Sequence, residues 1–418
     1  MLVDRTVFQH RLFLNKRFKP TNTMKSNIGI LAPLQAGIED FKGVFQEQIR
    51  TMVRNGLLDL MAQEVTDLCG RSQHPEGGIF RRAGTEAVTI RTTSGKEKIA
   101  KRRVRAMQED GSEMEVRLNT YEEIRSARGL FDEILEGMCH GASSSGVGKM
   151  TDMSKGTVAR AWKERSNELL TAFRARDLSG IDVLAVYLDG VFPGKERCVV
   201  VAMAIDVNGL KHLLDFEEGS SESAEVVTGL LERVTRRGLV VGRDRRVLVL
   251  RDGSAAIAKA VSGFWPDAVQ QECLVHVERV VCAKLSYKHK RGFVEMMNVL
   301  RGVQGEAAGE EAFDGVLKYV KERNFAAFEA LSARRDGILA FHRLNVPATL
   351  NVTFLSTNHI ENVMGNARGT IGRVCRWHDE TNQLARWMSV ALLRAQSGFR
   401  RVRGHKELPD LVTALARR

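Results

Sequence analysis

The sequence predicts an α/β protein whose central part holds one mixed sheet. Three strand-like runs follow one another in residues 182–219, "DVLAVYLDG", "RCVVVAMAID" and "LKHLLDFEEG", separated by the turn sequences "PGK" and "VNG". A helical run, the apolar run "RRVLVLRDG", a second helical run and the strand-like "AVQQECLVHV" complete the order. A three-stranded meander followed by helix, strand, helix and strand is the order of a ribonuclease-H-like core.

The boundaries of these central elements are well marked. The helical run "SSESAEVVTGLLERVTRRGL" begins with serine and glutamate start signals and ends at Gly238. The run "RRVLVLRDG" is highly apolar, which is typical of a strand buried on both faces. In the predicted order this fourth strand lies beside the first.

The chain before the core begins with two regions. Residues 1–75 combine a weakly periodic leader with a helical run that ends at Gly70. Residues 76–122 carry short alternating runs around "TSGK" and "EDGS", which predict a small antiparallel β-unit. Its basic run "KEKIAKRRVR" offers Arg102 and Arg103 for phosphate contact, and a solvated strand face is the other interpretation.

Residues 123–180 resemble a helix-turn-helix region. Ser154 can cap a helix in which Val158 and Trp162, four residues apart, face the core. The side chains expected to point away from that core are Lys155, Arg160 and Lys163. They favour DNA contact by this helix, although a plain three-helix packing unit gives the same pattern.

The chain after the fifth strand is mainly helical. Residues 279–347 contain no strand signal and predict an α-helical insertion. The C-terminal part is strongly basic, with eleven Lys and Arg against four Asp and Glu in residues 366–418. The predicted domains are 1–75, 76–122, 123–180, the first part of the core at 181–278, the insertion at 279–347, and the last part of the core with basic helices at 348–418.

Composition points to a polyanionic partner. The 418 residues carry a formal net charge of +12, which favours nucleic acid over a membrane, although a basic enzyme of another kind has the same balance. The six cysteines form no CxxC pair, so a reducing cytoplasm is expected rather than a disulfide scaffold. No apolar run reaches the length of a membrane span, and we expect a soluble bacterial protein with no membrane partner.

Two acidic residues follow apolar runs in the same way. Asp189 ends "AVYLDG" and Asp252 ends "VLVLRDG", so adjacent strands would bring both to one end of the sheet. A third carboxylate, Glu361, lies in "STNHIENV", where Thr357 or Asn358 can cap a helix. Three carboxylates suit two Mg²⁺ ions, with Mn²⁺ as the alternative, for cleavage of a phosphodiester.

These residues carry a resemblance to the Mutator-type transposases of bacterial insertion sequences, a DDE family. The segments concerned are "YLDG", "LRDG", "CLVH" and above all "STNHIENVMGNARGTIGRV", across roughly residues 40 to 400. The resemblance implies Asp189, Asp252 and Glu361 as a metal-binding triad, binding to terminal inverted repeats and target DNA, and strand cleavage and transfer. Two DNA ends would require a homodimer or larger assembly.

Basic residues after the glutamate extend the predicted site. Arg368 follows Glu361 by two helical turns on the same face, where it can neutralise a phosphate, and Arg373 is a further DNA-binding candidate. Cys273 and His276 form a CxxH pair, interpreted as a structural motif at the end of the fifth strand, with zinc binding and a role near DNA as alternatives.

Three functions remain open from the sequence. The leading one is an active DDE transposase associated with the nucleoid when bound to DNA. A non-catalytic DNA-binding descendant and a nuclease of the same fold without strand transfer are the alternatives. Gly365 and Gly369 depart from the arginine-rich segment usual in the family and weaken that helix by up to about 1 kcal/mol each.

Overall fold

The computed structural model describes residues 31–72, 74–75, 78–92, 95–125, 128–194, 197–241, 244–372, 374 and 376–417. The chain forms two compact units, Met1–Gly129 and Leu130–Arg418, and each is described by itself. Among the described residues, no helix combines the length and the apolar character needed to cross a membrane.

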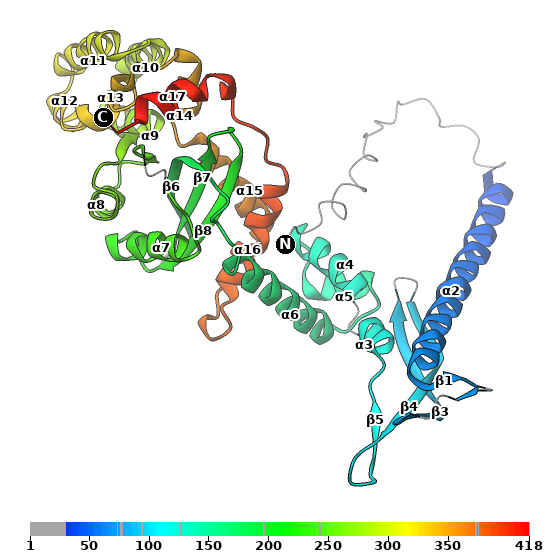
Figure 1. Cartoon of the computed structure of the whole chain (residues 1–418). Helices are drawn as coiled ribbons and strands as arrows, with labels where there is room; N and C mark the ends of the chain where they lie inside the picture. The colour runs from blue at the N-terminus through cyan, green and yellow to red at the C-terminus, as the bar shows by residue number, and fades with distance from the viewer. Residues whose placement is uncertain are drawn as a thin grey trace. The chain divides into compact units, whose positions relative to one another are not determined.

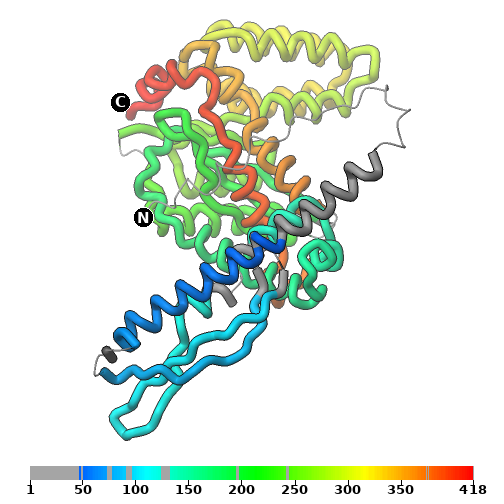
Figure 2. Tube along the Cα trace, turned by 90° about the vertical axis from the view of Figure 1, so that its right-hand side faces the viewer, coloured from blue at the N-terminus to red at the C-terminus, as the bar shows by residue number. Residues whose placement is uncertain are grey.

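The first unit is a long helix beside an antiparallel sheet. Figure 2 shows α2 (Leu31–Cys69) alongside the hairpin of β3 (Phe80–Thr92) and β4 (Gly95–Met107), and the two are in contact. Buried residues of α2 and the strands, among them Met61, Val65, Ile90, Ile99 and Val104, hold them together. The predicted small antiparallel β-unit is confirmed.

The remaining elements of this unit are short. Strand β5 (Glu113–Val116) extends the sheet beside β4, and the pair β1 (Gly70–Arg71) and β2 (His74–Pro75) follows α2. Gly70 ends the helix with a φ of 71°, a conformation that glycine adopts at little cost, as the sequence predicts. Helix α3 (Asn119–Arg125) closes the unit, and α4 (Arg128–Cys139) leads into the next.

The second unit contains a five-stranded mixed sheet. Its strands are β6 (Val183–Gly194), β7 (Arg197–Asp206), β8 (Lys211–Gly219), β9 (Leu248–Arg251) and β10 (Val269–Glu272). They lie in the order β10-β9-β6-β7-β8, with β6, β7 and β8 antiparallel and β9 and β10 parallel to β6. The first and fourth predicted strands are therefore neighbours, as expected.

Helices cover both faces of this sheet (Figure 1). On one face, α7 (Ala224–Arg236) and α8 (Ala255–Phe264) pack against Val200, Ala202 and the other even-numbered positions of β7. On the other face, odd-numbered positions such as Val201 and Met203 join a larger core with helices from the C-terminal half. Burial on both faces explains why β7 is apolar at every position from Cys198 to Ile205 instead of alternating.

The chain between β10 and α15 is helical wherever it is regular. Its elements are α9 (Leu274–Lys284), α10 (Tyr287–Gly302), α11 (Glu306–Lys321), α12 (Phe325–Ser332), α13 (Arg335–Leu339), two 3-10 turns (His342–Leu344 and Ala348–Leu350) and α14 (Asn351–Phe354). Gln271 of β10 anchors them, because its buried amide donates to the Ile338 carbonyl at 3.0 Å and accepts from the Phe341 N–H at 2.8 Å.

After these helices the chain returns to the sheet. α15 (Asn358–Ile371) contacts β6, and α16 (Gln383–Ser397) contacts α15, β8 and α6. Two 3-10 turns (Asp379–Thr381 and His405–Glu407) and α17 (Leu408–Leu415) complete the unit. The segment with Glu361 is thus adjacent to the strand with Asp189, although 172 residues separate them.

The predicted helix-turn-helix region consists of α5 (Ser144–Met150) and α6 (Lys155–Arg174). Val158 and Trp162 are buried as expected, and the Trp162 ring packs on Trp387 of α16 with centroids 4.4 Å apart. The predicted outward-facing side chains are exposed: Lys155, Arg160 and Lys163. One face of α6 therefore packs in the core, and the opposite, basic face is exposed to solvent.

Replacing Ser154 with alanine is expected to destabilise the second unit by about 1 kcal/mol. The Ser154 hydroxyl accepts a hydrogen bond from the Thr157 N–H at 3.1 Å, which satisfies one free donor of α6. Ser286→Ala is the matched control, because Ser286 stands at the N-cap of α10 without a side-chain capping bond. Thermal unfolding of both variants measures the difference, and equal losses would contradict this account of the cap.

Candidate active site

The two aspartates lie at the same level on adjacent strands. The prediction that Asp189 stands at the tip of its strand is wrong, because β6 continues to Gly194 in its pairing with β7. On its other side, β6 pairs with β9 only as far as Leu188 opposite Arg251. Asp189 is the first residue of β6 beyond that pairing, and Asp252 is the first residue after β9, so both stand where β9 ends.

Asp189 interacts electrostatically with the other two predicted carboxylates. The residue is buried, and burial together with the negative charges of Asp252 and Glu361 raises the pKa of its carboxyl to about 7. His276 opposes the shift. One Asp189 oxygen accepts the Gly190 N–H at 2.9 Å, and an Asp252 oxygen accepts the Ser254 N–H at the same distance.

Glu361 stands in the first turn of α15, as predicted, but the helix begins differently. Thr357 is the N-cap residue, yet its side chain makes no capping bond. Its hydroxyl instead donates to Glu361 Oε1 at 3.0 Å, and Arg279 of α9 donates to Glu361 Oε2 at 3.3 Å. The Glu361 carboxylate therefore accepts hydrogen bonds from the N-cap residue of its own helix and from α9.

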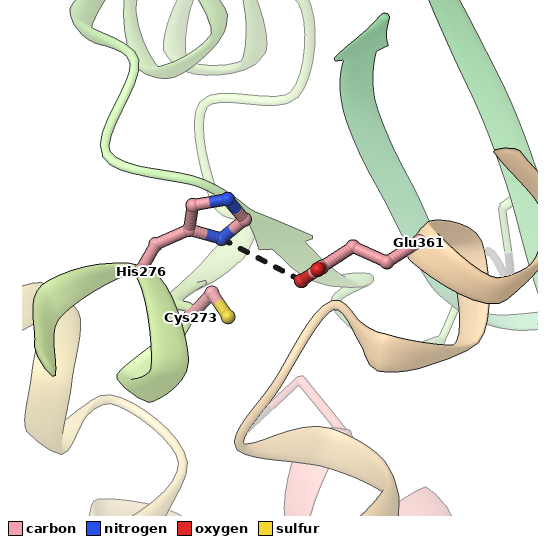
Figure 3. A group of neighbouring side chains, drawn as sticks. All are labelled: Cys273, His276 and Glu361. Atoms are coloured by element: carbon pink, nitrogen blue, oxygen red, sulfur yellow. Dashed lines mark ion pairs between the residues drawn. The ribbon is translucent and has the colours of Figure 1, made fainter. Parts of the chain in front are cut away.

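The CxxH pair contacts the same turn of α15 (Figure 3). Cys273 Sγ accepts the Thr357 N–H at 3.3 Å, and His276 Nδ1 lies 3.4 Å from the Thr357 hydroxyl and 3.8 Å from Glu361 Oε1. A hydrogen bond with Cys273 and the charges of Cys273, Asp189 and Glu361 together raise the pKa of His276 to about 9, although burial opposes the rise. The pair thus joins the start of α9 to the start of α15.

This group is also chemically able to hold a soft metal. One ligand atom each of Cys273, His276 and Glu361 lies within 4.8 Å of the others. Burial alone would raise the pKa of the Cys273 thiol, but hydrogen bonds from His276 and Thr357 lower it overall. The hydrogen bonds that join Cys273, His276 and Thr357 account for these contacts without an ion.

A further carboxylate, Glu222, was missed by the sequence interpretation. It stands just before Ser223, the N-cap of α7, in a segment whose serines and glutamates predict only the start of a helix. Burial raises the pKa of Glu222, and the charge of Asp252 raises it further. The sequence signal that could have identified it is its place in the connection after the third strand of the meander.

The basic candidates are distributed over both units. In the second unit, the exposed Arg368 borders a partly open hollow of about 220 Å³ with an apolar lining that includes Phe192, Met364 and Ile371. In the first unit, Arg102 is exposed, whereas Arg103 pairs with Glu115, its Nε donating at 3.1 Å. Arg373 lies outside the described residues.

The comparisons with known proteins identify the class as transposases. The model of the Mutator family of transposases matches residues 31–394, and the chain belongs to this family. A transposase for the insertion sequence element IS1201 of Lactobacillus helveticus is 29% identical over 197 residues, covering 46% of this chain and 51% of the relative. One for IS6120 of Mycolicibacterium smegmatis is 27% identical over 232 residues, covering 53% and 68%.

A third relative has a similar extent. The transposase for IS905 of Lactococcus lactis is 23% identical over 216 residues, covering 50% of this chain and 53% of the relative. The chain thus spans about half the length of two of these three relatives and two thirds of the other.

Proposed function

We propose that the protein is a DNA transposase, which cuts the ends of a mobile DNA element and joins them to target DNA through a ribonuclease-H-like core. The observation that carries the proposal is that Asp189 and Asp252 both lie where β9 ends, and that α15, which contains Glu361, contacts β6. The strand order β10-β9-β6-β7-β8 agrees with such a core. Relatives named as insertion-sequence transposases support the same activity.

The residues of the site fit Mg²⁺, with Mn²⁺ as a substitute. Their donors are hard carboxylate oxygens, and the raised pKa of buried Asp189 indicates carboxylates that need a neighbouring cation to ionise together. A pair of bound ions supplies positive charge to the attacking and leaving oxygens of a phosphodiester. Asp189 and Asp252 would hold the ions jointly, and Glu361 would complete the second position.

The surrounding residues have roles of their own. Thr357 and Arg279 fix the orientation of Glu361 through the hydrogen bonds described above. Arg368, exposed two turns further along α15, would contact a DNA phosphate beside the carboxylates. The basic face of α6 would bind the double-stranded inverted repeat, and two repeats would bring two copies of the chain together. Such a protein would act on DNA of the bacterial nucleoid.

The proposal is tested on DNA that carries the repeats flanking the gene. With Mg²⁺ or Mn²⁺ we expect nicks that leave a 3′-OH at the element end, followed by joining of that end to a second duplex. DNA binding without cleavage would overturn the enzymatic part of the proposal. Cleavage without joining, measured with precleaved ends, would favour the nuclease of the same fold.

Replacing Arg368 with alanine is expected to weaken DNA binding by a similar factor for all sequences and to reduce the salt slope of log K by about 1. The reason is the loss of one phosphate contact. Fluorescence anisotropy between low and moderate salt measures the slope. Arg291→Ala is the control, because Arg291 is an exposed arginine that pairs with Glu295 on α10. An unchanged slope in Arg368→Ala would contradict the assignment.

A further inference from the structure

We propose that the apolar hollow bordered by Arg368 binds a single DNA base, unstacked from its neighbours beside the cleaved phosphate, and that Phe192 stacks on this base. The ligand is therefore a nucleotide, with its base in the hollow and its phosphate at the rim. The inference rests on the proposed function for the presence of DNA, and it adds a base-binding site next to the carboxylates.

The hollow lies between the end of β6 and two helices. Its volume is about 220 Å³, and its lining includes Val191 and Phe192 of β6, Met364 and Ile371 of α15, and Met388 of α16. Four of these side chains are buried, whereas that of Phe192 is 61% exposed. An aromatic ring that is open to solvent beside an apolar hollow offers a flat face on which any base can stack.

The hollow adjoins the candidate active site through β6 and through α15. Asp189 and Val191 are two residues apart on the same face of β6, so about 7 Å separates them along the strand. On α15, Met364 and Arg368 follow Glu361 by three and seven residues, or about 5 Å and 10 Å along the helix. A DNA strand advances about 3.4 Å per nucleotide. A base in the hollow would therefore belong to one of the first three nucleotides beside the cleaved phosphate.

Charge at the rim favours a nucleotide over an apolar segment of protein. Arg368 borders the hollow, and Arg376 precedes Trp377, whose Nε1 donates to the Pro193 carbonyl at the edge of the hollow at 3.4 Å. Both arginines are exposed, and neither forms an ion pair or a hydrogen bond with another described residue. An apolar hollow with free guanidinium groups beside it suits a ligand that is flat and apolar at one end and anionic at the other.

The test measures, by fluorescence anisotropy without divalent ions, how the full chain binds DNA that carries the repeat flanking the gene, with its three terminal nucleotides unpaired. Phe192→Ala is expected to weaken binding about tenfold, and Phe192→Tyr, which keeps the ring face, is expected to restore it. Removing the base at one of the three positions should weaken binding to the unchanged protein equally and abolish its advantage over Phe192→Ala. Phe325→Ala is the matched control, because Phe325 of α12 is 62% exposed.

Two results would overturn the inference while the proposed function stands. If Phe192→Ala weakens binding by the same factor for intact DNA and for DNA lacking each base in turn, Phe192 does not contact a base. If Phe192→Ala leaves DNA affinity unchanged but lowers the mass of the free protein in light scattering, the hollow holds a second copy of the chain. Failure of the proposed function looks different, because the unchanged protein would then not bind or cleave the repeat DNA at all.

Discussion

Replacing Asp252 with asparagine is expected to reduce Mg²⁺-dependent strand cleavage about 10³-fold, equivalent to about 4 kcal/mol, with little change in DNA affinity. The substitution removes the negative charge but keeps the shape of the side chain. An asparagine oxygen can still accept the Ser254 N–H that Asp252 Oδ1 accepts in the present structure, so the turn after β9 should persist. The loss would therefore report on cation binding rather than on folding.

Cleavage of end-labelled DNA under single-turnover conditions measures this effect, and anisotropy measures affinity in parallel. Asp410→Asn is the matched control, since Asp410 is an exposed carboxylate in the first turn of α17. If Asp252→Asn still cleaves DNA at a rate within tenfold of that of the unchanged protein, Asp252 is not a catalytic residue. A parallel loss of DNA affinity would instead indicate a disturbed fold.

The core order could be predicted because each of its elements has a local signal. The apolar runs of β6, β7 and β9 and the start of α7 are determined by burial and capping within about ten residues. The sequence predicts the end of β6 too early, because the apolar run stops at Leu188. Its continuation to Gly194 depends on hydrogen bonds from β7, which periodicity does not report.

The site was only partly predictable for a related reason. The sequence placed Glu361 in the first turn of a helix, but its partners Thr357, Cys273 and His276 meet there only because α9 and α15 both begin at this end of the sheet. Glu222 follows the apolar run of β8 by three residues, but its contact with Gly190 exists only in three dimensions.

In the metal-free protein, the contribution of Asp189 to the free energy of unfolding is expected to fall as pH rises from about 4 to about 7. The folded-state pKa of Asp189 is about 7 against an ordinary value of 3.8, so the folded state binds the proton more tightly than the unfolded state. Stability from this group is fully present below the lower value and is lost as pH rises to the higher one. Between pH 5 and pH 8 the loss amounts to roughly 2–3 kcal/mol.

Asp189→Asn isolates this contribution from the other titrating groups. Urea unfolding at pH 5 and pH 8 should show the variant gaining stability over the unchanged protein by that amount at the higher pH, because asparagine needs no proton. Mg²⁺ should raise the stability of the unchanged protein at pH 8 and leave the variant little affected, since the cation replaces the proton as the partner of Asp189. If the difference in stability between the two proteins is independent of pH, burial and the neighbouring carboxylates do not shift the pKa of Asp189. A pH-dependent difference without an effect of Mg²⁺ would mean that its charge is offset by something other than a divalent ion.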